Sequence, residues 1–280
     1  MLVSPKVFLR DHQKKEFSKQ RTKVKETHLF YSPQIAHGIC ELPEDEAKHA
    51  VRVLRMQEGD TLTITDGMGY FYEAHITLAS KAHCAFAIDK KWADHKLWQS
   101  EINLAVAPTK NIDRIEWFVE KATEIGVDHI YLLLCDNSER RVVKNERLEK
   151  IAISAMKQSH KAFKPQISLM TTFKDFLKKD HNGQRFIAHC YSPEETEAQG
   201  EMSHLSGRNF LGDLLKADEP SIVLIGPEGD FSIREVKEAK AADFQPISLG
   251  ESRLRTETAA LVAVHLMYLA KRIKSINEEK

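Results

Sequence analysis

The chain has 280 residues, of which 42% are hydrophobic, and its formal net charge at pH 7 is zero. This length exceeds the usual size of one compact domain, so we expect two domains with enough apolar residues for a core in each. The neutral charge excludes the strongly basic class of nucleic-acid-binding proteins. Any RNA binding therefore has to depend on local positive charge.

Cysteine usage and the apolar segments bear on cofactors and compartment. The four cysteines are scattered and form no Cys-x-x-Cys pair, so we expect reduced thiols, no disulfide framework and no metal site. The longest apolar stretch, Ala259–Ala270, contains His265 and is too short to span a bilayer. The N-terminus has no convincing signal peptide. We therefore expect a soluble cytoplasmic protein with no membrane partner.

Residues 1–27 form a separate basic segment. They contain eight Lys and Arg residues against three Asp and Glu residues, with few apolar residues at any regular period. This composition favours a mobile, solvated arm. The alternative is a basic arm that contacts RNA phosphates.

A β-rich unit is predicted next. Alternating and β-branched residues predict four strands, at His28–Tyr31, Thr61–Thr65, Tyr70–Leu78 and Ala82–Ile88. Pro43 and the acidic residues that follow it predict a helix that runs to Met56. Asp66–Gly69 has the composition of a turn. A helix among short strands indicates a small barrel, followed by a charged linker at Asp89–Ser100.

Strands and helices alternate from Glu101 onward. The predicted strands are Ile102–Ala107, His129–Leu134, Arg185–Cys190, Ser221–Ile225 and Pro246–Leu249. The predicted helices span residues 112–125, 146–160, 232–242 and 257–274, the first of them capped by Asn111. This alternation predicts an α/β domain in which helices cover both faces of a parallel sheet. Residues 191–220 are polar and predict loops.

Two strand ends carry unusual turns. Gly226–Asp230 has two glycines and a proline, and Ser232 with Glu235 then forms a capping-box pattern. This sequence fits either an ordinary strand-to-helix turn or a loop that a ligand approaches closely. The second turn, Leu249–Thr258, carries two arginines and two glutamates before an apolar helix. Arg255 and Glu257 either pair locally, or the arginines contact a carboxylate or RNA.

Most common cofactor and catalytic motifs are missing from the sequence. It has no dinucleotide-binding glycine fingerprint, no Walker motif, no His-Glu-x-x-His and no Gly-x-Ser-x-Gly. The segments Ile225–Gly229 and Leu249–Ala259 instead resemble the signature of the ribosomal RNA small subunit methyltransferase E family, in the SPOUT class of knotted methyltransferases. Lys110–Glu116 and Lys121–Gly126 resemble that family's charged helix, and His49–Arg55 resembles its N-terminal domain.

The sequence departs from the family pattern at two places. Asp230 stands where many relatives have a second glycine, and residues 1–27 have no counterpart in the pattern. The resemblance implies a PUA-like RNA-binding β-barrel domain at residues 28–96 and a trefoil-knotted SPOUT domain with a parallel sheet at residues 97–280. It leaves residues 1–27 outside both domains, as a basic N-terminal extension.

The resemblance also implies a function. Family members use S-adenosylmethionine to methylate N3 of one uridine in the decoding region of 16S ribosomal RNA. The implied partners are 16S rRNA, within the small ribosomal subunit, and a second copy of the chain in a homodimer. Two alternatives stay open, namely a knotted methyltransferase for another RNA such as tRNA, and a non-catalytic RNA-binding relative.

The resemblance finally assigns site residues. Three loops are expected to bind the cofactor through His189, Cys190, Ile225, Gly226, Pro227, Glu228, Gly229, Leu249, Gly250, Ser252, Leu254 and Thr256. Methylation at N3 requires loss of a proton, and the uracil anion needs a nearby cation. Arg253 and Arg255 are the candidates for this cation, and Glu228, or alternatively Glu257, is the candidate for the base.

RNA contacts are expected from four further basic residues, Arg52, Arg55, Lys110 and Arg140. Arg52 and Arg55 are three residues apart, which would place them on one face of the predicted N-terminal helix. They could grip RNA phosphates there, or form an ordinary solvated surface pair.

Overall fold

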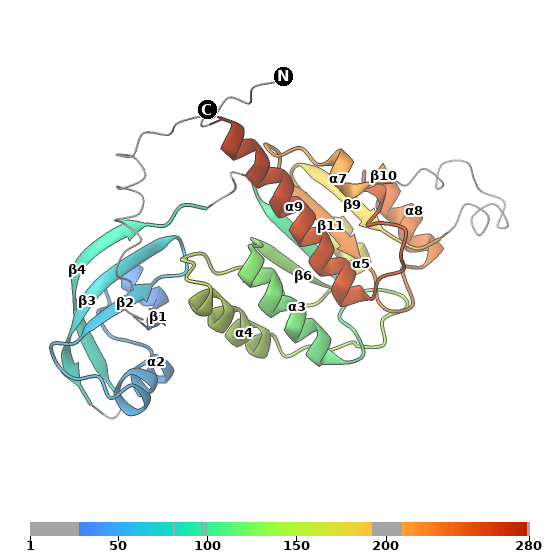
Figure 1. Cartoon of the computed structure of the whole chain (residues 1–280). Coiled ribbons are helices and arrows are strands. Elements are labelled where there is room, and N and C mark those ends of the chain that lie inside the picture. Colours follow the sequence, from blue (N-terminus) through green and yellow to red (C-terminus); the bar gives the residue numbers. More distant parts are fainter. Residues whose placement is uncertain (1–27, 81, 97, 99, 192–208, 279–280) are drawn as a thin grey trace, which may run out of the picture.

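The computed structural model describes residues 28–80, 82–96, 98, 100–191 and 209–278, with side chains described up to residue 272. Figure 1 shows two units, one built on an N-terminal sheet and the other on a larger sheet covered by helices. The expectations for the basic segment 1–27 lie outside the described residues.

The N-terminal unit is a four-stranded sheet with the order β1-β2-β3-β4. Its strands are β1 (Leu29–Tyr31), β2 (Thr61–Thr65), β3 (Tyr70–Ala79) and β4 (Cys84–Ala93). The strand β1 pairs parallel to β2, and the other pairs are antiparallel. Apolar side chains of one face form a separate core that includes Phe30, Ile64 and Phe86. A 3₁₀ turn, η1 (Pro33–His37), follows β1.

The predicted linker is shorter than expected. The pairing of β3 with β4 continues from Ala79↔Cys84 to Tyr70↔Ala93, well past the predicted strand end at Ile88. The charged residues of the predicted linker Asp89–Ser100 therefore lie partly in β4. Charge did not end the strand, because side chains on an exposed face of a sheet can remain solvated.

The predicted helix Pro43–Met56 ends earlier than expected, and its second half is π-helical. The α-helix α2 (Glu44–Lys48) continues as a π-helical turn, η2 (His49–Val53). Arg55 then adopts φ 58°, and the Met56 N–H donates to the Ala50 carbonyl. A residue in this left-handed conformation ends a helix. Arg52 and Arg55 therefore do not share a helix face, although both are exposed.

The C-terminal unit contains an eight-stranded sheet whose main path is β10-β12-β9-β11-β5-β6-β7, with β8 paired to β6. Its strands are β5 (Ile102–Val106), β6 (His129–Leu134), β7 (Gln166–Ile167), β8 (Thr171–Thr172), β9 (Gln184–Ala188), β10 (Asn209–Phe210), β11 (Ser221–Ile225) and β12 (Gln245–Ser248). The paired strands are parallel, as predicted. The short elements β7, β8 and β10 were not predicted.

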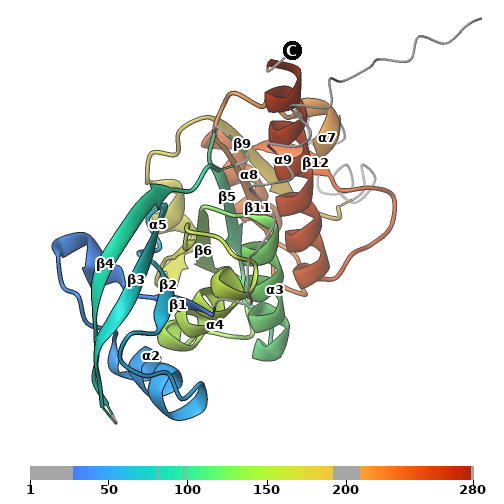
Figure 2. The same ribbon diagram turned by 60° about the vertical axis from the view of Figure 1, so that its left-hand side comes forward.

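Helices cover both faces of this sheet. One face carries α3 (Ile112–Ile125), α4 (Asn145–Gln158), α7 (Leu211–Leu214) and α9 (Thr256–Glu278), and α3 and α9 run side by side (Figures 1 and 2). The other face carries α5 (Phe173–Leu177) and α8 (Ile233–Ala241). Neighbouring residues of β5 enter opposite cores, Leu104 on the α3 side and Ala105 on the α8 side. This alternation is the reason a buried parallel strand reads as a continuous apolar run.

The C-terminal helix α9 is more one-sided than its sequence predicted. Ala260, Val264 and Met267 are buried against the sheet and α3, whereas His265 and Leu269 on the outer side are exposed. Within the described part of the chain, no helix is both long and apolar enough to cross a membrane.

The two units meet through backbone contacts. The turn between β2 and β3 docks on the segment after α4: the Gly69 N–H donates to the Ala162 carbonyl, and the Lys164 N–H donates to the Gly67 carbonyl, at 2.8 and 2.9 Å. Lys157 of α4 also pairs with Glu46 of α2 at 2.6 Å.

Candidate active site

Three loops meet at one edge of the large sheet. They follow β9, β11 and β12, which are neighbours in the order β12-β9-β11. Because these strands are parallel, their carboxyl ends lie at the same edge, where open α/β sheets bind ligands. The loops line a cavity of about 790 Å³.

Most of the residues predicted to bind a cofactor line this cavity. They are His189, Cys190, Ile225, Gly226, Pro227, Glu228, Leu249, Gly250, Ser252, Leu254 and Thr256. The catalytic candidates Arg253 and Arg255 lie there too. Gly229 is not part of the lining, and a Cβ on it would meet the Asn137 Cβ at 3.2 Å. Gly229 therefore contacts the loop after β6 instead of the cavity.

Gly226 and Asp230 shape the loop after β11. A Cβ on Gly226 would lie 3.0 Å from the Phe231 backbone nitrogen, so the turn closes tightly only without a side chain. Asp230 adopts φ 62°, in the left-handed region where glycine is common. Its carboxylate accepts a hydrogen bond from the Cys190 N–H at 2.6 Å, which joins two of the three loops. Burial raises the pKa of the Asp230 carboxyl, against the opposing effects of this bond and of Arg253.

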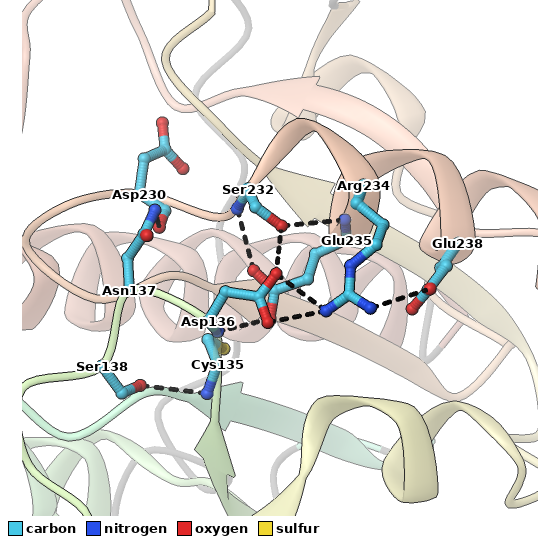
Figure 3. A network of polar contacts seen from close by, with 9 residues as sticks. All are labelled: Cys135, Asp136, Asn137, Ser138, Asp230, Ser232, Arg234, Glu235 and Glu238. Carbon is cyan, nitrogen blue, oxygen red and sulfur yellow. Dashed lines mark hydrogen bonds and ion pairs between the residues drawn. The ribbon is translucent and has the colours of Figure 1, made fainter.

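The loop after β6 supports the glycine turn, Gly226–Asp230 (Figure 3). Asn137 Nδ2 donates to the backbone carbonyls of Gly229 and Asp230 at 3.2 and 3.1 Å. The hydroxyl of Ser138 in turn accepts a hydrogen bond from the Cys135 N–H at 3.0 Å, which closes the loop on itself. The two Asn137 bonds hold the backbone of the turn at Gly229 and Asp230.

The start of α8 is bound to the same loop (Figure 3). Ser232 and Glu235 form the predicted capping box. The Ser232 hydroxyl also donates to Asp136 Oδ2 at 2.6 Å, and Arg234 pairs with Asp136 at 2.7 Å. The Ser232 bond and the Arg234 ion pair hold the pKa of the Asp136 carboxyl below its ordinary value.

Glu228 is connected to the loop after β5. Its Oε1 accepts a hydrogen bond from the Lys110 N–H at 3.0 Å. The Lys110 side chain is 75% exposed and pairs with Glu139 at 2.8 Å. Arg140 donates from Nε to the Thr109 carbonyl at 2.9 Å and from Nη2 to the Lys110 carbonyl. Arg140 therefore holds the backbone that contacts Glu228, a role that the sequence did not predict.

Arg114 and Glu257 form a charged pair at the cavity. Arg114, in the first turn of α3, lines the cavity, and its Nη1 lies 3.7 Å from Glu257 Oε1. The structure thus pairs Glu257 with α3 and not with Arg255. Arg114 was missed as a site residue, and its one sequence signal was its place within Lys110–Glu116, the segment that resembles the family's charged helix.

Comparisons with known proteins agree with this geometry. The sequence model of an RNA methyltransferase domain matches residues 96–268, and that of an RNA methyltransferase PUA domain matches residues 42–89. Ribosomal RNA small subunit methyltransferase E of Rickettsia conorii is 30% identical over 86% of this chain and 94% of its own length. This chain belongs to the ribosomal RNA small subunit methyltransferase E family. It is therefore an enzyme, a methyltransferase that acts on ribosomal RNA, as predicted.

Two solved structures resemble this methyltransferase over most of its length. A probable rRNA-methyltransferase from Porphyromonas gingivalis is 42% identical, with a TM-score of 0.78 over 88% of this chain and 99% of that one. Ribosomal RNA small subunit methyltransferase E from Neisseria gonorrhoeae, solved with bound S-adenosylmethionine, is 25% identical, with a TM-score of 0.72 over 87% and 97%. The predicted fold class, a parallel-sheet domain behind a PUA domain, is confirmed.

The basic residues predicted to contact RNA lie on both units of the methyltransferase. Lys110 and Arg140 lie beside Glu228 and the cavity. Arg52 and Arg55 lie in the N-terminal unit, on η2 and just after it.

Proposed function

We propose that this methyltransferase modifies N3 of a uridine in the decoding region of 16S rRNA, within the small ribosomal subunit. The observation that supports the proposal is the cavity at the sheet edge, where two arginines and a glutamate stand beside glycine turns. The methyl donor is S-adenosylmethionine, as in the related Neisseria structure.

The residues of the cavity fit this cofactor. Ile225, Leu249 and Leu254 offer an apolar surface suited to a flat base, and Gly226 and Gly250 leave backbone groups open to close approach. We assign the holding of the cofactor to the cavity-lining residues of the three loops. Gly229 has an indirect part, because it contacts Asn137 and not the cavity.

The chemistry sets specific demands on the residues. When bound, S-adenosylmethionine supplies a methyl group on a positively charged sulfur. Uracil N3 carries a proton and attacks only after losing it. We assign Arg253 and Arg255 to stabilise the negative charge on the uracil oxygens. Glu228, held by the Lys110 N–H, takes the proton. Glu257 is the poorer base, because it is buried and paired with Arg114.

RNA binding is assigned to both units. Arg52, Arg55 and Lys110 are exposed cations suited to phosphates, and Arg140 acts by fixing the Lys110 backbone. We place the RNA-binding domain at residues 28–96 and the knotted methyltransferase domain at residues 97–280. We also propose a homodimer that buries the outer side of α9, and a cytoplasmic location, where the ribosomal substrate is found.

Nucleoside mapping tests the proposed substrate. Cells that lack this protein should lose 3-methyluridine from 16S rRNA, and the purified protein with S-adenosylmethionine should restore it on isolated small subunits. Loss of a modified nucleoside from tRNA would favour the alternative, a knotted enzyme for another RNA. A protein that binds rRNA but neither binds S-adenosylmethionine nor restores any methyl group would be the non-catalytic relative.

Single-turnover kinetics test the catalytic arginines. Arg253→Ala and Arg255→Ala should each slow methyl transfer about a hundredfold while melting temperature and cofactor affinity stay near the wild-type values. A variant with a lowered melting temperature and mixed defects would identify a structural arginine. Normal transfer in both variants would refute the assignment and leave Glu228 as the next residue to test.

A further inference from the structure

The Arg114 guanidinium lies in the cavity wall with its hydrogen-bond donors still without acceptors among the described residues. It lies in the first turn of α3, lines the cavity, and its side chain is 37% exposed. Its Nη1 is 3.7 Å from Glu257 Oε1, which is an ion-pair distance but too long for a hydrogen bond. The guanidinium has five N–H donors, and within the described residues none of them has an acceptor. These donors remain for a ligand.

Glu257 holds Arg114 at the cavity by electrostatic attraction, and we call this carboxylate the tether. It stands in the first turn of α9, where the helix dipole favours an anion, and its side chain is only 10% exposed. Its Oε2 has no hydrogen-bond partner among the described residues. A buried carboxylate of this kind needs a nearby cation, and among the described residues its ion pair is with Arg114. The attraction keeps the guanidinium at the cavity before any substrate arrives.

The position of Arg114 points to the RNA side of the cavity. The glycine turns that suit the cofactor follow β11 and β12, whereas Arg114 follows β5, on the opposite side of β11 from β9 and β12. Lys110, whose exposed ammonium suits a phosphate, lies four residues before Arg114, in the loop that leads into α3. Arg253 and Arg255 are exposed on the loop after β12. Arg253 acts electrostatically on the half-buried Asp230, but among the described residues neither arginine forms an ion pair with a carboxylate.

We propose that Arg114 is a catalytic residue that touches the target uracil and donates a hydrogen bond to the ring oxygen on which negative charge collects. This inference rests on the proposed function. Methylation forms a bond between N3 and the methyl carbon, the methyl–sulfur bond breaks with its electron pair left on sulfur, and the N3 proton passes to the Glu228 carboxylate. A fixed cation beside the ring oxygen lowers the free energy of the uracil anion without having to reorganise.

Three variants test the role of Arg114. Arg114→Ala should slow single-turnover methylation of 16S rRNA about a hundredfold, and Arg114→Lys should recover part of that loss. Glu257→Gln, which removes the tether's charge, should slow it less. The Kd for S-adenosylmethionine, measured by calorimetry without RNA, should stay within about twofold of wild type in all three. Arg147→Ala is the matched control. Arg147 lies on α4 and forms an ion pair with Glu116 of α3, and neither residue lines the cavity.

The pH profile separates a catalytic role from a structural one. If Arg114 favours the uracil anion, the rate of Arg114→Ala should keep rising to a higher pH than that of wild type, and the two rates should converge in alkaline buffer. A constant rate deficit at every pH would overturn the proposal. A cofactor Kd that rises in parallel with the rate loss would also overturn it, by placing the guanidinium at the cofactor. A wild-type protein that methylates no uridine N3 would instead refute the proposed function.

Discussion

At the scale of single residues, backbone conformation explains which side chains stand in the glycine turn. Asp230 occupies a position with φ 62°, which accounts for the glycine common at this point in the family pattern. Aspartate tolerates this conformation better than most residues and adds a carboxylate that a glycine lacks. That carboxylate accepts the Cys190 N–H and so connects two loops of the cavity. Aspartate in place of glycine at position 230 therefore adds one hydrogen bond between the loops after β9 and β11.

Gly226 gives the prediction at this scale. Gly226→Ala places a Cβ 3.0 Å from the Phe231 backbone nitrogen, so the loop has to move away from its cofactor-binding shape. Overpacking of this kind costs roughly 1 to 3 kcal/mol, which corresponds to a loss of about fivefold to 150-fold in affinity for S-adenosylmethionine. Calorimetry measures this directly. Gly229→Ala is the control, because its Cβ would face Asn137 outside the cavity, and it should lose less affinity. Equal losses would contradict the assignment of the two glycines.

At the scale of elements, the start of α8 is bound to the loop after β6, which supports the glycine turn. Ser232 caps the helix through the Glu235 N–H and at the same time donates to Asp136 in the loop after β6. Asn137 of the same loop binds the carbonyls of the glycine turn. The cap is therefore connected to the cavity through a second loop, and its loss should affect binding as well as stability.

Ser232→Ala should lower the free energy of unfolding by about 1 kcal/mol through the lost cap. The pKa of Asp136 is lowered in the folded state, so its contribution is present above the ordinary aspartate value of 3.8 and is lost as the pH falls through the folded-state pKa. The deficit of the variant in urea unfolding should therefore shrink in acid.

The control for Ser232→Ala is a cap that does not belong to the cavity lining. Thr172 caps α5 by accepting the Asp175 N–H at 3.1 Å. Thr172→Ala should cost a similar free energy of unfolding, while the affinity for S-adenosylmethionine falls only in Ser232→Ala. A drop in affinity in both variants would mean that general destabilisation, and not the loop contact, is responsible.

At the scale of the whole molecule, Gly67 and Gly69 allow the N-terminal unit to approach the segment after α4. A Cβ on Gly69 would meet the Phe163 ring at 2.6 Å, across the junction of the units. Gly69→Ala should therefore loosen the junction, with a cost of roughly 1 to 3 kcal/mol beyond the strain of its positive φ. Limited proteolysis after residue 93 and rRNA methylation should report the change. Gly59→Ala is the control, because it has the same kind of φ but no atom within 4 Å.

A buried lysine predicts a pH dependence of overall stability. Lys271 of α9 is 2% exposed and donates to Ser100 Oγ and to the Glu219 carbonyl, both at 2.6 Å. Burial lowers its pKa from 10.5 to about 8. Between these values the unfolded chain binds more protons, so the free energy of unfolding should rise with pH across this window.

The size of the Lys271 effect follows from the pKa difference. It corresponds to about 3 kcal/mol. Urea unfolding at both ends of the window, compared between wild type and Lys271→Met, isolates this contribution because the other titrating groups are common to both proteins. If the difference in free energy of unfolding between the two proteins does not change with pH, burial does not destabilise the charged ammonium as expected.

Several features followed from local sequence because their causes are local. The helix α3 begins after Asn111 because the Asn111 side chain accepts the Asp113 N–H, and the capping box of α8 formed between residues three apart. Apolar runs such as Ser221–Ile225 predicted buried parallel strands, because both faces of such a strand are covered. The glycine turns could be read for the same reason, since their backbone geometry depends on a few adjacent residues.

Only the tertiary structure decided which distant residues meet. The order β12-β9-β11-β5 brings loops together that are up to about 140 residues apart in sequence, and no local pattern encodes that order. The partner of Glu257 proved to be Arg114, and Arg140 proved to hold backbone near Glu228, because the sheet places these segments side by side. The early end of the N-terminal helix at Arg55 could likewise not be predicted from the sequence. A left-handed residue there is stabilised by the fold around it and not by its own conformational preference.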